Sequence, residues 1–358
     1  MIKRIDRYII KKFIGTYVFV LILIIAISVV FDINEKIDKF LAPNVPLKAI
    51  VFDYYLNFIP YFVNLYSALI TFISVIYFTS KMADDSEIIA ILSNGISFRR
   101  LMLPYMISAL IIASVTFFLN SYVIPPANIK RLDFQHTYIN NKKVTYASNV
   151  QAEVEPGIVV YFDRYDAELK RGYRFSMEKF DGKHLQSRLT AQRIEYDTAY
   201  QWRLQNYMIR DFDGMKENIS SGITKDTTIR IMPSDFLISQ SDGEKMTNTE
   251  LRSHIKRQKN RGIGNITLFE LEYAERYANL LSSFILTIIG ASLSSRKIKG
   301  GMGLNIGIGL LLSSSYILFM TVSSTFAISG LMSPVMSSWT PNLIFSAIAI
   351  YLYRRAPR

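Results

Sequence analysis

The sequence predicts a membrane α-helical protein with six transmembrane helices and an inserted all-β jelly-roll domain. The first observation is that charge is absent from long apolar stretches, of which residues 300–353 form the longest at 54 residues. About 18 such residues are enough to cross a ~30 Å hydrocarbon core. The second observation is that residues 142–242 have a charge every few residues. One soluble globule cannot contain both kinds of region, so we expect a polytopic membrane protein with a water-soluble insert.

Three spans are predicted before the insert and three after it. They are Phe13–Phe31, Leu56–Thr79, Leu101–Ile124, Tyr277–Ser295, Leu304–Phe326 and Met336–Tyr353. The uncharged run of the first span exceeds a signal-peptide core of about 7 to 15 residues, and no A-x-A site follows it, so we expect a retained helix. The chain then divides into residues 1–124 with spans one to three, an insert at 125–265, and residues 266–358 with spans four to six.

Basic residues in the short loops predict the orientation. Fourteen Lys and Arg residues lie on one side, whereas the opposite loops, 32–49 and 327–335, hold three. The fourteen are in residues 1–12, 80–100, 296–303 and 354–358. Loops rich in Lys and Arg stay in the cytoplasm. Both termini are therefore predicted to be cytoplasmic and the insert periplasmic, in a bacterial inner membrane. These clusters account for much of the formal charge of +12, so no nucleic-acid partner is predicted.

The insert is rich in β-branched and aromatic residues. The predicted strands are 158–162, 173–180, 185–196, 202–212 and 227–232. Asp181-Gly182 and Asp213-Gly214 indicate turns. Short strands at this spacing predict a sandwich, a jelly roll or an open barrel, and the many aromatic residues favour an open-edged jelly roll with an apolar interior. A polar helix at 247–261, beginning at Thr247 or Asn248, is predicted to lead back to the membrane.

The residue content argues against an enzyme. The chain has no cysteine, which excludes disulfides, thiolate metal sites and cysteine catalysis. Its three histidines have no metal-ligand spacing, so no metal site is predicted. Gly182-Lys183 lacks the upstream glycine of the phosphate loop GxxxxGK[ST], so the chain does not hydrolyse ATP by that route. Glycines near the start of the fifth span are better explained by close helix packing than by dinucleotide binding.

The loop between spans two and three is predicted to hold a short helix near residues 84–95. Asp84 and Glu87 have the spacing of a capping box, and Asn94-Gly95 supplies a stop. Apolar residues fall on one face of this helix, and acidic residues lie at its N-terminal end, where the helix dipole favours them. Such a helix is suited to dock on a partner protein. The alternative is a helix that lies flat among lipid headgroups, although such helices usually carry Lys or Arg.

Five blocks of the sequence resemble the lipopolysaccharide export permeases, the F/G-type membrane subunits of the Lpt transporter. These blocks are IDRYIIKKFIGTY, SEIIAILSNGIS, LTAQRIEYDTAYQWRLQN, SSRKIKGGMGLNIGIGLLL and WTPNLIFSAIAIYLYRR. Their order is more specific than any one of them, and together they cover nearly the whole chain. The start of the chain is more similar to the G subunit and the WTPNLI segment to the F subunit. Asn279 stands where relatives often have a proline.

The resemblance implies a permease subunit that extracts lipopolysaccharide from the outer leaflet of the inner membrane and passes it to a periplasmic jelly-roll bridge protein. It implies a second homologous permease subunit around a lipid cavity and a cytoplasmic ABC ATPase dimer. This chain would need no cofactor, because the ATPase would bind ATP and Mg. The loop helix would be the coupling helix that grips the ATPase. The predicted coupling residues are Asp85, Glu87, Ile88, Ile91, Leu92 and Gly95.

Lys36 and Lys39, just outside span one, are the predicted contacts for lipid phosphates, as basic residues near membrane helices are for other anionic lipids. Ordinary snorkelling at the interface is the alternative for each lysine. Two other functions stay open: a permease for another envelope lipid or lipoprotein, and a membrane-anchored envelope sensor or scaffold.

Overall fold

A computed structural model describes residues 3–139, 146–214, 216–236, 242–260, 266–296 and 301–356. The chain forms two compact units. The helical unit comprises residues 1–140, 244–248 and 267–358, and the β unit comprises residues 141–243 and 249–266. The predicted loop 296–303 lies partly outside the described residues.

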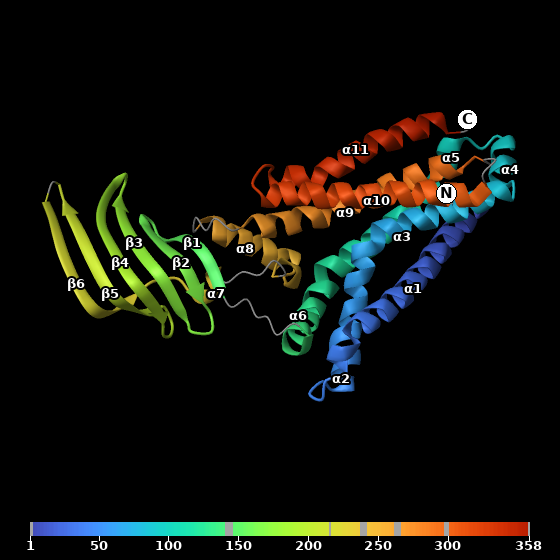
Figure 1. The fold of residues 1–358 in the computed structure, drawn as a ribbon. Helices are drawn as coiled ribbons and strands as arrows, with labels where there is room; N and C mark the ends of the chain where they lie inside the picture. The colour runs from blue at the N-terminus through green and yellow to red at the C-terminus, as the bar shows by residue number, and fades with distance from the viewer. Residues whose placement is uncertain are drawn as a thin grey trace. The chain divides into compact units, whose positions relative to one another are not determined.

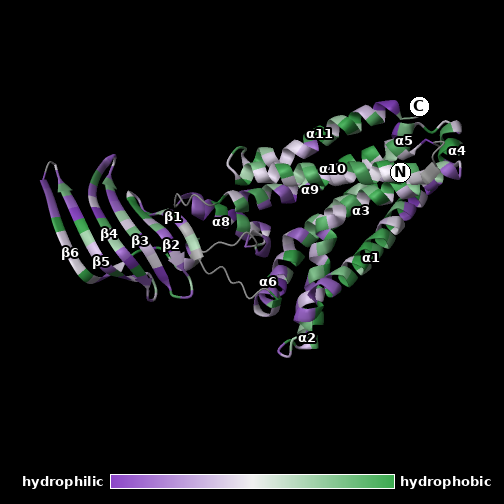
Figure 2. Cartoon of the chain, in the orientation of Figure 1, coloured by the Kyte–Doolittle hydropathy of each residue, from purple (hydrophilic) through white to green (hydrophobic). Residues whose placement is uncertain are grey.

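Six helices are long and apolar enough to cross a membrane, as predicted. They are α1 (Arg4–Phe40), the stretch Leu47–Asp84 (α2, Leu47–Ala49; η1, Ile50–Tyr55; α3, Leu56–Asp84), the stretch Phe98–Ile139 (α5, Phe98–Phe118; η2, Leu119–Val123; α6, Ile124–Phe134; η3, Gln135–Ile139), α9 (Thr267–Ser294), α10 (Gly301–Ile328) and α11 (Pro334–Arg355). Figure 2 shows the apolar residues that predominate along them.

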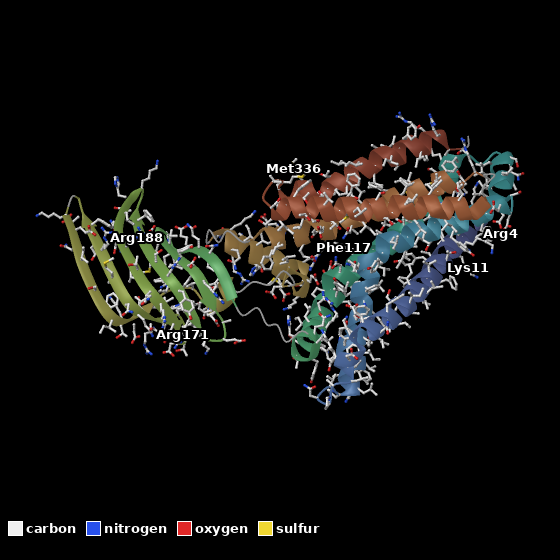
Figure 3. The ribbon with its side chains drawn as sticks, viewed as in Figure 1. Arg4, Lys11, Phe117, Arg171, Arg188 and Met336 are labelled. Carbon is white, nitrogen blue, oxygen red and sulfur yellow. The ribbon has the colours of Figure 1, made fainter. Side chains whose placement is uncertain are left out.

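The basic ends of the spans meet at one end of the helical unit. The start of α1, the short helix α4 (Glu87–Ser93) and the end of α11 lie there (Figure 1). Arg4 and Lys11 lie toward this end, whereas Met336 lies toward the other (Figure 3). This arrangement agrees with the sequence argument that the termini and the loop between spans two and three share one side of the membrane.

Several helices extend beyond the predicted spans. Helix α1 has 37 residues, which corresponds to a length of about 55 Å, well above a ~30 Å hydrocarbon core. The absence of charge marks only the part of a helix that lipid would cover, so a prediction based on it underestimates the length of the helix. In two stretches a π-helical segment precedes a proline: η1 precedes Pro60, and η2 precedes Pro125. Pro104 of α5 and Pro341 of α11, by contrast, lie inside α-helices without such a segment before them.

The spans pack through aromatic and small residues. Phe78 of α3 stacks on Phe13 of α1 and Tyr105 of α5, with ring centroids 5.1 and 5.2 Å apart. On α9, a Cβ at Gly290 would come within 2.9 Å of Val75, so only glycine permits this approach. Gly309 of α10 lies as closely against α3, whereas Gly303 and Gly307 have no such neighbour among the described residues. The predicted packing role is therefore seen for one glycine of this series.

The β unit contains one six-stranded antiparallel sheet in the order β1-β2-β3-β4-β5-β6. The strands are β1 (Tyr146–Glu155), β2 (Ile158–Asp166), β3 (Arg171–Asp181), β4 (His184–Tyr196), β5 (Gln201–Asp213) and β6 (Lys216–Thr228). Gly182 and Gly214 take positive φ values of 58° and 60° in the turns, which confirms the two predicted turn positions. Strand β1 was not predicted, and of β6 only Thr227 and Thr228 lie in a predicted strand.

The open edge is confirmed, but the jelly roll is not. A jelly roll needs Greek-key connections between two sheets, whereas each described strand pairs with the next one along the chain. Short turns explain this order, because they return the chain directly beside the strand it has just left.

One face of the sheet is apolar and is partly covered by the segment after β6. Residues 229–232 do not extend the sheet, so the predicted strand 227–232 is wrong beyond Thr228. Instead, the indole Nε1 of Trp202 donates a hydrogen bond of 3.1 Å to the Ile231 carbonyl. Phe236, in the short helix α7 (Pro233–Phe236), packs on Phe162 and Tyr165 with ring centroids 5.3 and 4.8 Å away. Helix α8 (Asn248–Asn260) then follows, as predicted.

Candidate functional site

The loop helix α4 begins differently from the prediction. Asp84 still belongs to α3, which ends there, so it does not cap α4. The residue before α4 is Ser86, whose φ of 60° lies in the left-handed region and turns the chain sharply between the two helices. The predicted capping box is therefore wrong. The predicted stop is correct, because Gly95 has a φ of 82° and its N–H bonds the Leu92 carbonyl at 3.0 Å.

Glu87, the acidic residue of α4, is held by helix α1. The Tyr8 hydroxyl donates to both carboxylate oxygens at 3.0 and 2.9 Å. The Lys12 ammonium group contacts the same oxygens at 2.9 and 3.1 Å. These charge-assisted contacts join residues 79 and 75 positions apart in the sequence. They fix the N-terminal end of α4 to the first span.

The apolar face of α4 faces the core of its own chain. Ile88 is completely buried, and Ile91 and Leu92 pack against the same cluster of side chains. Ile89 points away from this core and is 53% exposed. Asp85 is also exposed. Of the predicted coupling residues, therefore, Asp85 and Gly95 are exposed and available to a partner, whereas the three apolar ones anchor the helix.

A second ion pair holds α1 at this end. The guanidinium group of Arg100, at the start of α5, donates to the two carboxylate oxygens of Asp6 at 2.8 and 2.7 Å. The Asp6 side chain is 1% exposed, and it also accepts a bond of 2.7 Å from the Lys3 amide. Two-pronged arginine–carboxylate contacts fix geometry as well as distance. Helix α1 is thus bound to α4 through Glu87 and to α5 through Arg100.

Lys36 and Lys39 do not form a joint site. The Lys36 ammonium group pairs with Asp32 and donates a bond of 2.6 Å to the Tyr54 hydroxyl. Tyr55 donates a bond of 3.0 Å to the same Asp32 carboxylate. Lys39 is exposed at the end of α1. Lys36 is therefore satisfied inside the helical unit, and Lys39 is the lysine that a headgroup could reach.

A buried polar network lies where the chain returns from the β unit. Arg131 of α6 is 8% exposed at its side chain, lies 4.0 Å from the Tyr61 ring centre and contacts Glu244 at 3.5 Å. Burial, and next the nearby carboxylate of Glu272, raise the pKa of Glu244 to about 7. The Asn128 amide also lies 3.4 Å from this carboxyl group.

Arg276 of α9 belongs to the same buried polar network. Its guanidinium group, 1% exposed, donates to Glu272 at 2.9 Å, to the Met246 carbonyl at 2.9 Å and to the Asn248 side chain at 2.8 Å. Asn248 in turn donates to Ser121 at 2.8 Å. This network was not predicted from the sequence. The available clue was the charge of Arg276 directly before a predicted span, since buried charges need partners.

The apolar face of the sheet forms the hydrophobic core of the β unit, and most of its apolar side chains are buried. Its rows of inward residues run from β1 to β5 and end at Gly222 of β6, where a Cβ would come within 2.8 Å of the Tyr207 ring. The segment 229–236 covers the part near Trp202. Among the described residues, no group of three His, Asp or Glu side chains could hold a metal ion.

The sequence was also compared with known families. A family model described as lipopolysaccharide export system permease LptF/LptG matches residues 7–355, which is nearly the whole chain. The chain belongs to the LptF/LptG family. No curated protein matches it individually.

LptF/LptG proteins are membrane transport subunits for lipopolysaccharide export and not catalytic enzymes. Together with the six spans, this membership identifies a multi-pass inner-membrane protein. In this LptF/LptG permease, the predicted coupling residues lie in or directly beside α4, and Glu87 is bound by Tyr8 and Lys12 of α1. The two predicted lysines differ in their surroundings, because Lys36 is paired with Asp32 and Lys39 is exposed. The Arg131 and Arg276 network is an addition that only the structure provides.

Proposed function

We propose that this chain is the permease subunit of an ATP-driven transporter that extracts lipopolysaccharide from the outer leaflet of the inner membrane. The whole-chain family match is the observation that carries the proposal. Withdrawing acyl chains from a bilayer costs ~0.8 kcal/mol for each CH₂ exposed to water. Extraction therefore needs an energy source and an apolar receiving surface. A cytoplasmic ABC ATPase dimer with bound ATP and Mg supplies the energy, because this chain lacks the phosphate loop.

Helix α4 is the coupling helix in this proposal. Ile89 of α4 and Asp85 in the turn before it contact the ATPase, and the buried residues of α4 pass the movement inward. The hydrogen bonds from Tyr8 and Lys12 to Glu87 support this role, because a displacement of α4 then pulls directly on α1. Helix α1 has many exposed apolar residues, such as Phe19 and Ile22, which suits a wall of the lipid cavity shared with a second permease subunit.

The β unit is the periplasmic receiving surface. Its apolar face suits acyl chains, and the exposed edge of β6 can continue the sheet into a jelly-roll bridge protein by strand pairing. Both termini are then cytoplasmic, in line with the distribution of basic loops. Lys39 is placed to meet lipid phosphates at the outer end of α1.

Purification of the intact complex tests the proposal. We expect a separate nucleotide-binding protein, a second six-span subunit and bound lipopolysaccharide to accompany this chain. Glu87→Lys should weaken the association with the ATPase, because it opposes Lys12 with a second positive charge and releases α4. Lys11→Glu, a charge change at an exposed position of α1, is the control.

The alternatives predict other results. Copurification of a different lipid or a lipoprotein would favour another permease cargo. A chain that purifies without any ATPase would favour an envelope sensor or scaffold. Photocrosslinkers at inward positions of β4 and β5, such as Ala191 and Ile209, separate these cases. They should capture lipopolysaccharide only when ATP is hydrolysed.

A further inference from the structure

An apolar groove lies on the helical unit, and no residue of α1 lines it. It is a cavity of about 500 Å³ between helices α5, α9 and α11. Its lining is apolar except for Arg99, Ser346 and Tyr353. The apolar residues are Met102, Leu103, Met106, Leu281, Phe284, Ile285, Ile288, Ala349 and Ile350. No part of the coupling helix or of the β unit contributes to it.

This groove opens sideways toward the surroundings of the spans. Leu103 of α5, Leu281 of α9 and Ile350 of α11 line it, and these side chains are 45%, 38% and 55% exposed. All three helices are membrane-spanning candidates. The medium at the mouth of the groove is therefore lipid hydrocarbon rather than water.

One end of the groove is basic. Arg99, in the first turn of α5, is exposed, and among the described residues it has no hydrogen-bond or ion-pair partner. The rings of Phe98 and Tyr353 lie 5.8 Å apart at this end. Arg354 and Arg355 follow at the end of α11 and are also exposed. A ligand with an apolar chain and an anionic head would match both parts of this surface.

The length of the groove indicates what fills it. The lining residues of α11 run from Ser346 to Tyr353, which corresponds to about 10 Å of helix rise, or a third of a ~30 Å hydrocarbon core. A partner helix would need a groove that continues along the span. A single acyl chain occupies only one leaflet, and this groove lies within the leaflet on the arginine side.

We propose that this groove binds one acyl chain of an anionic phospholipid, with its phosphate group against Arg99. The ligand is a bilayer lipid of the leaflet beside α4, and it is distinct from the exported cargo. A fixed lipid there would brace α5 against α9 and α11. The proposal goes beyond the transport function and does not depend on the identity of the cargo.

Photolabelling of the purified complex in lipid nanodiscs tests the proposal. The discs contain phosphatidylcholine and a small fraction of phosphatidylglycerol with a photoreactive group in its acyl chain. We expect labels on residues 102–106, 281–288 and 346–353. Arg99→Gln should lower this labelling about fivefold, since one basic residue near the surface is worth about 1 kcal/mol. Arg7→Gln, which removes an exposed arginine of α1, is the matched control.

A second variant tests the groove itself. Ser346→Phe should fill the groove and remove most of the label from its lining residues. Label on Leu311 of α10, which is exposed outside the groove, should stay unchanged and shows that the protein is folded. Equal labelling by photoreactive phosphatidylcholine would refute the anionic preference. Labelling that persists in Ser346→Phe, or a crosslink to a protein in place of lipid, would refute the assigned occupant.

Discussion

Breaking the contact between α4 and α1 should loosen the proposed coupling helix by a measurable and limited amount. The Lys12 and Glu87 side chains are 27% and 30% exposed and lie 2.9 Å apart. Exposed ion pairs contribute ~0.2–1 kcal/mol, and hydrogen bonds to charged groups about 1.5–3 kcal/mol when they are shielded from water. The partial exposure of this pair places its coupling energy at about 1 kcal/mol, which corresponds to roughly a fivefold change in an equilibrium constant.

A double-mutant cycle measures this energy. The variants are Lys12→Met, Glu87→Gln and the two combined, each with spin labels on cysteines at positions 11 and 90. These labels are unique because the native chain has no cysteine. Pulsed electron resonance gives the fraction of molecules in which α4 has moved away from α1. Each single change should raise that fraction about fivefold, and the double variant should add little to either single one.

Two outcomes would refute the reasoning. If the effects of Lys12→Met and Glu87→Gln add fully in the double variant, the two side chains do not act on each other. If Arg7→Met, which removes an exposed charge of α1 without a described partner, has the same effect as Lys12→Met, the general charge of α1 is responsible and not the contact with Glu87.

Three further predictions concern the β unit and its attachment. Because the pKa of Glu244 is raised to about 7, the folded state binds the Glu244 proton more tightly than the unfolded state does. The stability that this proton contributes is complete below pH ~4.5 and is lost as the pH rises through 7. Glu244→Gln should therefore remove the dependence of the unfolding temperature on pH between pH 4.5 and 8. Trp202→Phe leaves the Ile231 carbonyl without its donor and should cost about 1–3 kcal/mol, measured by denaturant unfolding. A maleimide that cannot cross the membrane should label Asp181→Cys only from the periplasmic side and Ala90→Cys only from the cytoplasmic side.

The spans and several turns could be predicted because their causes are local in the sequence. A run of uncharged residues has the same meaning in any membrane helix, and Gly182 and Gly214 take the positive φ values that a tight turn requires. Strand β6 could not be predicted in this way. Its residues are mostly exposed on both faces, so no alternation of apolar and polar side chains reveals it.

The candidate site depended on contacts between distant residues. The spacing of Asp84 and Glu87 suits a helix cap, but Glu87 is instead bound by Lys12 and Tyr8 from another span. Likewise, an apolar face on α4 can meet a partner or its own core, and only the packing of Ile88 distinguishes these cases. Sequence spacing shows that such residues share a face, but it does not show what that face contacts.

The sequential order of the sheet has a consequence for how this protein is made. Every described strand pairs only with strands next to it in the chain, so the β contacts have low contact order and short loops to close. Each hairpin can form as soon as its second strand has left the ribosome. The insert therefore need not wait for synthesis of α9 to α11. Among the described strands, the outer edges of β1 and β6 then stay available for pairing with another polypeptide.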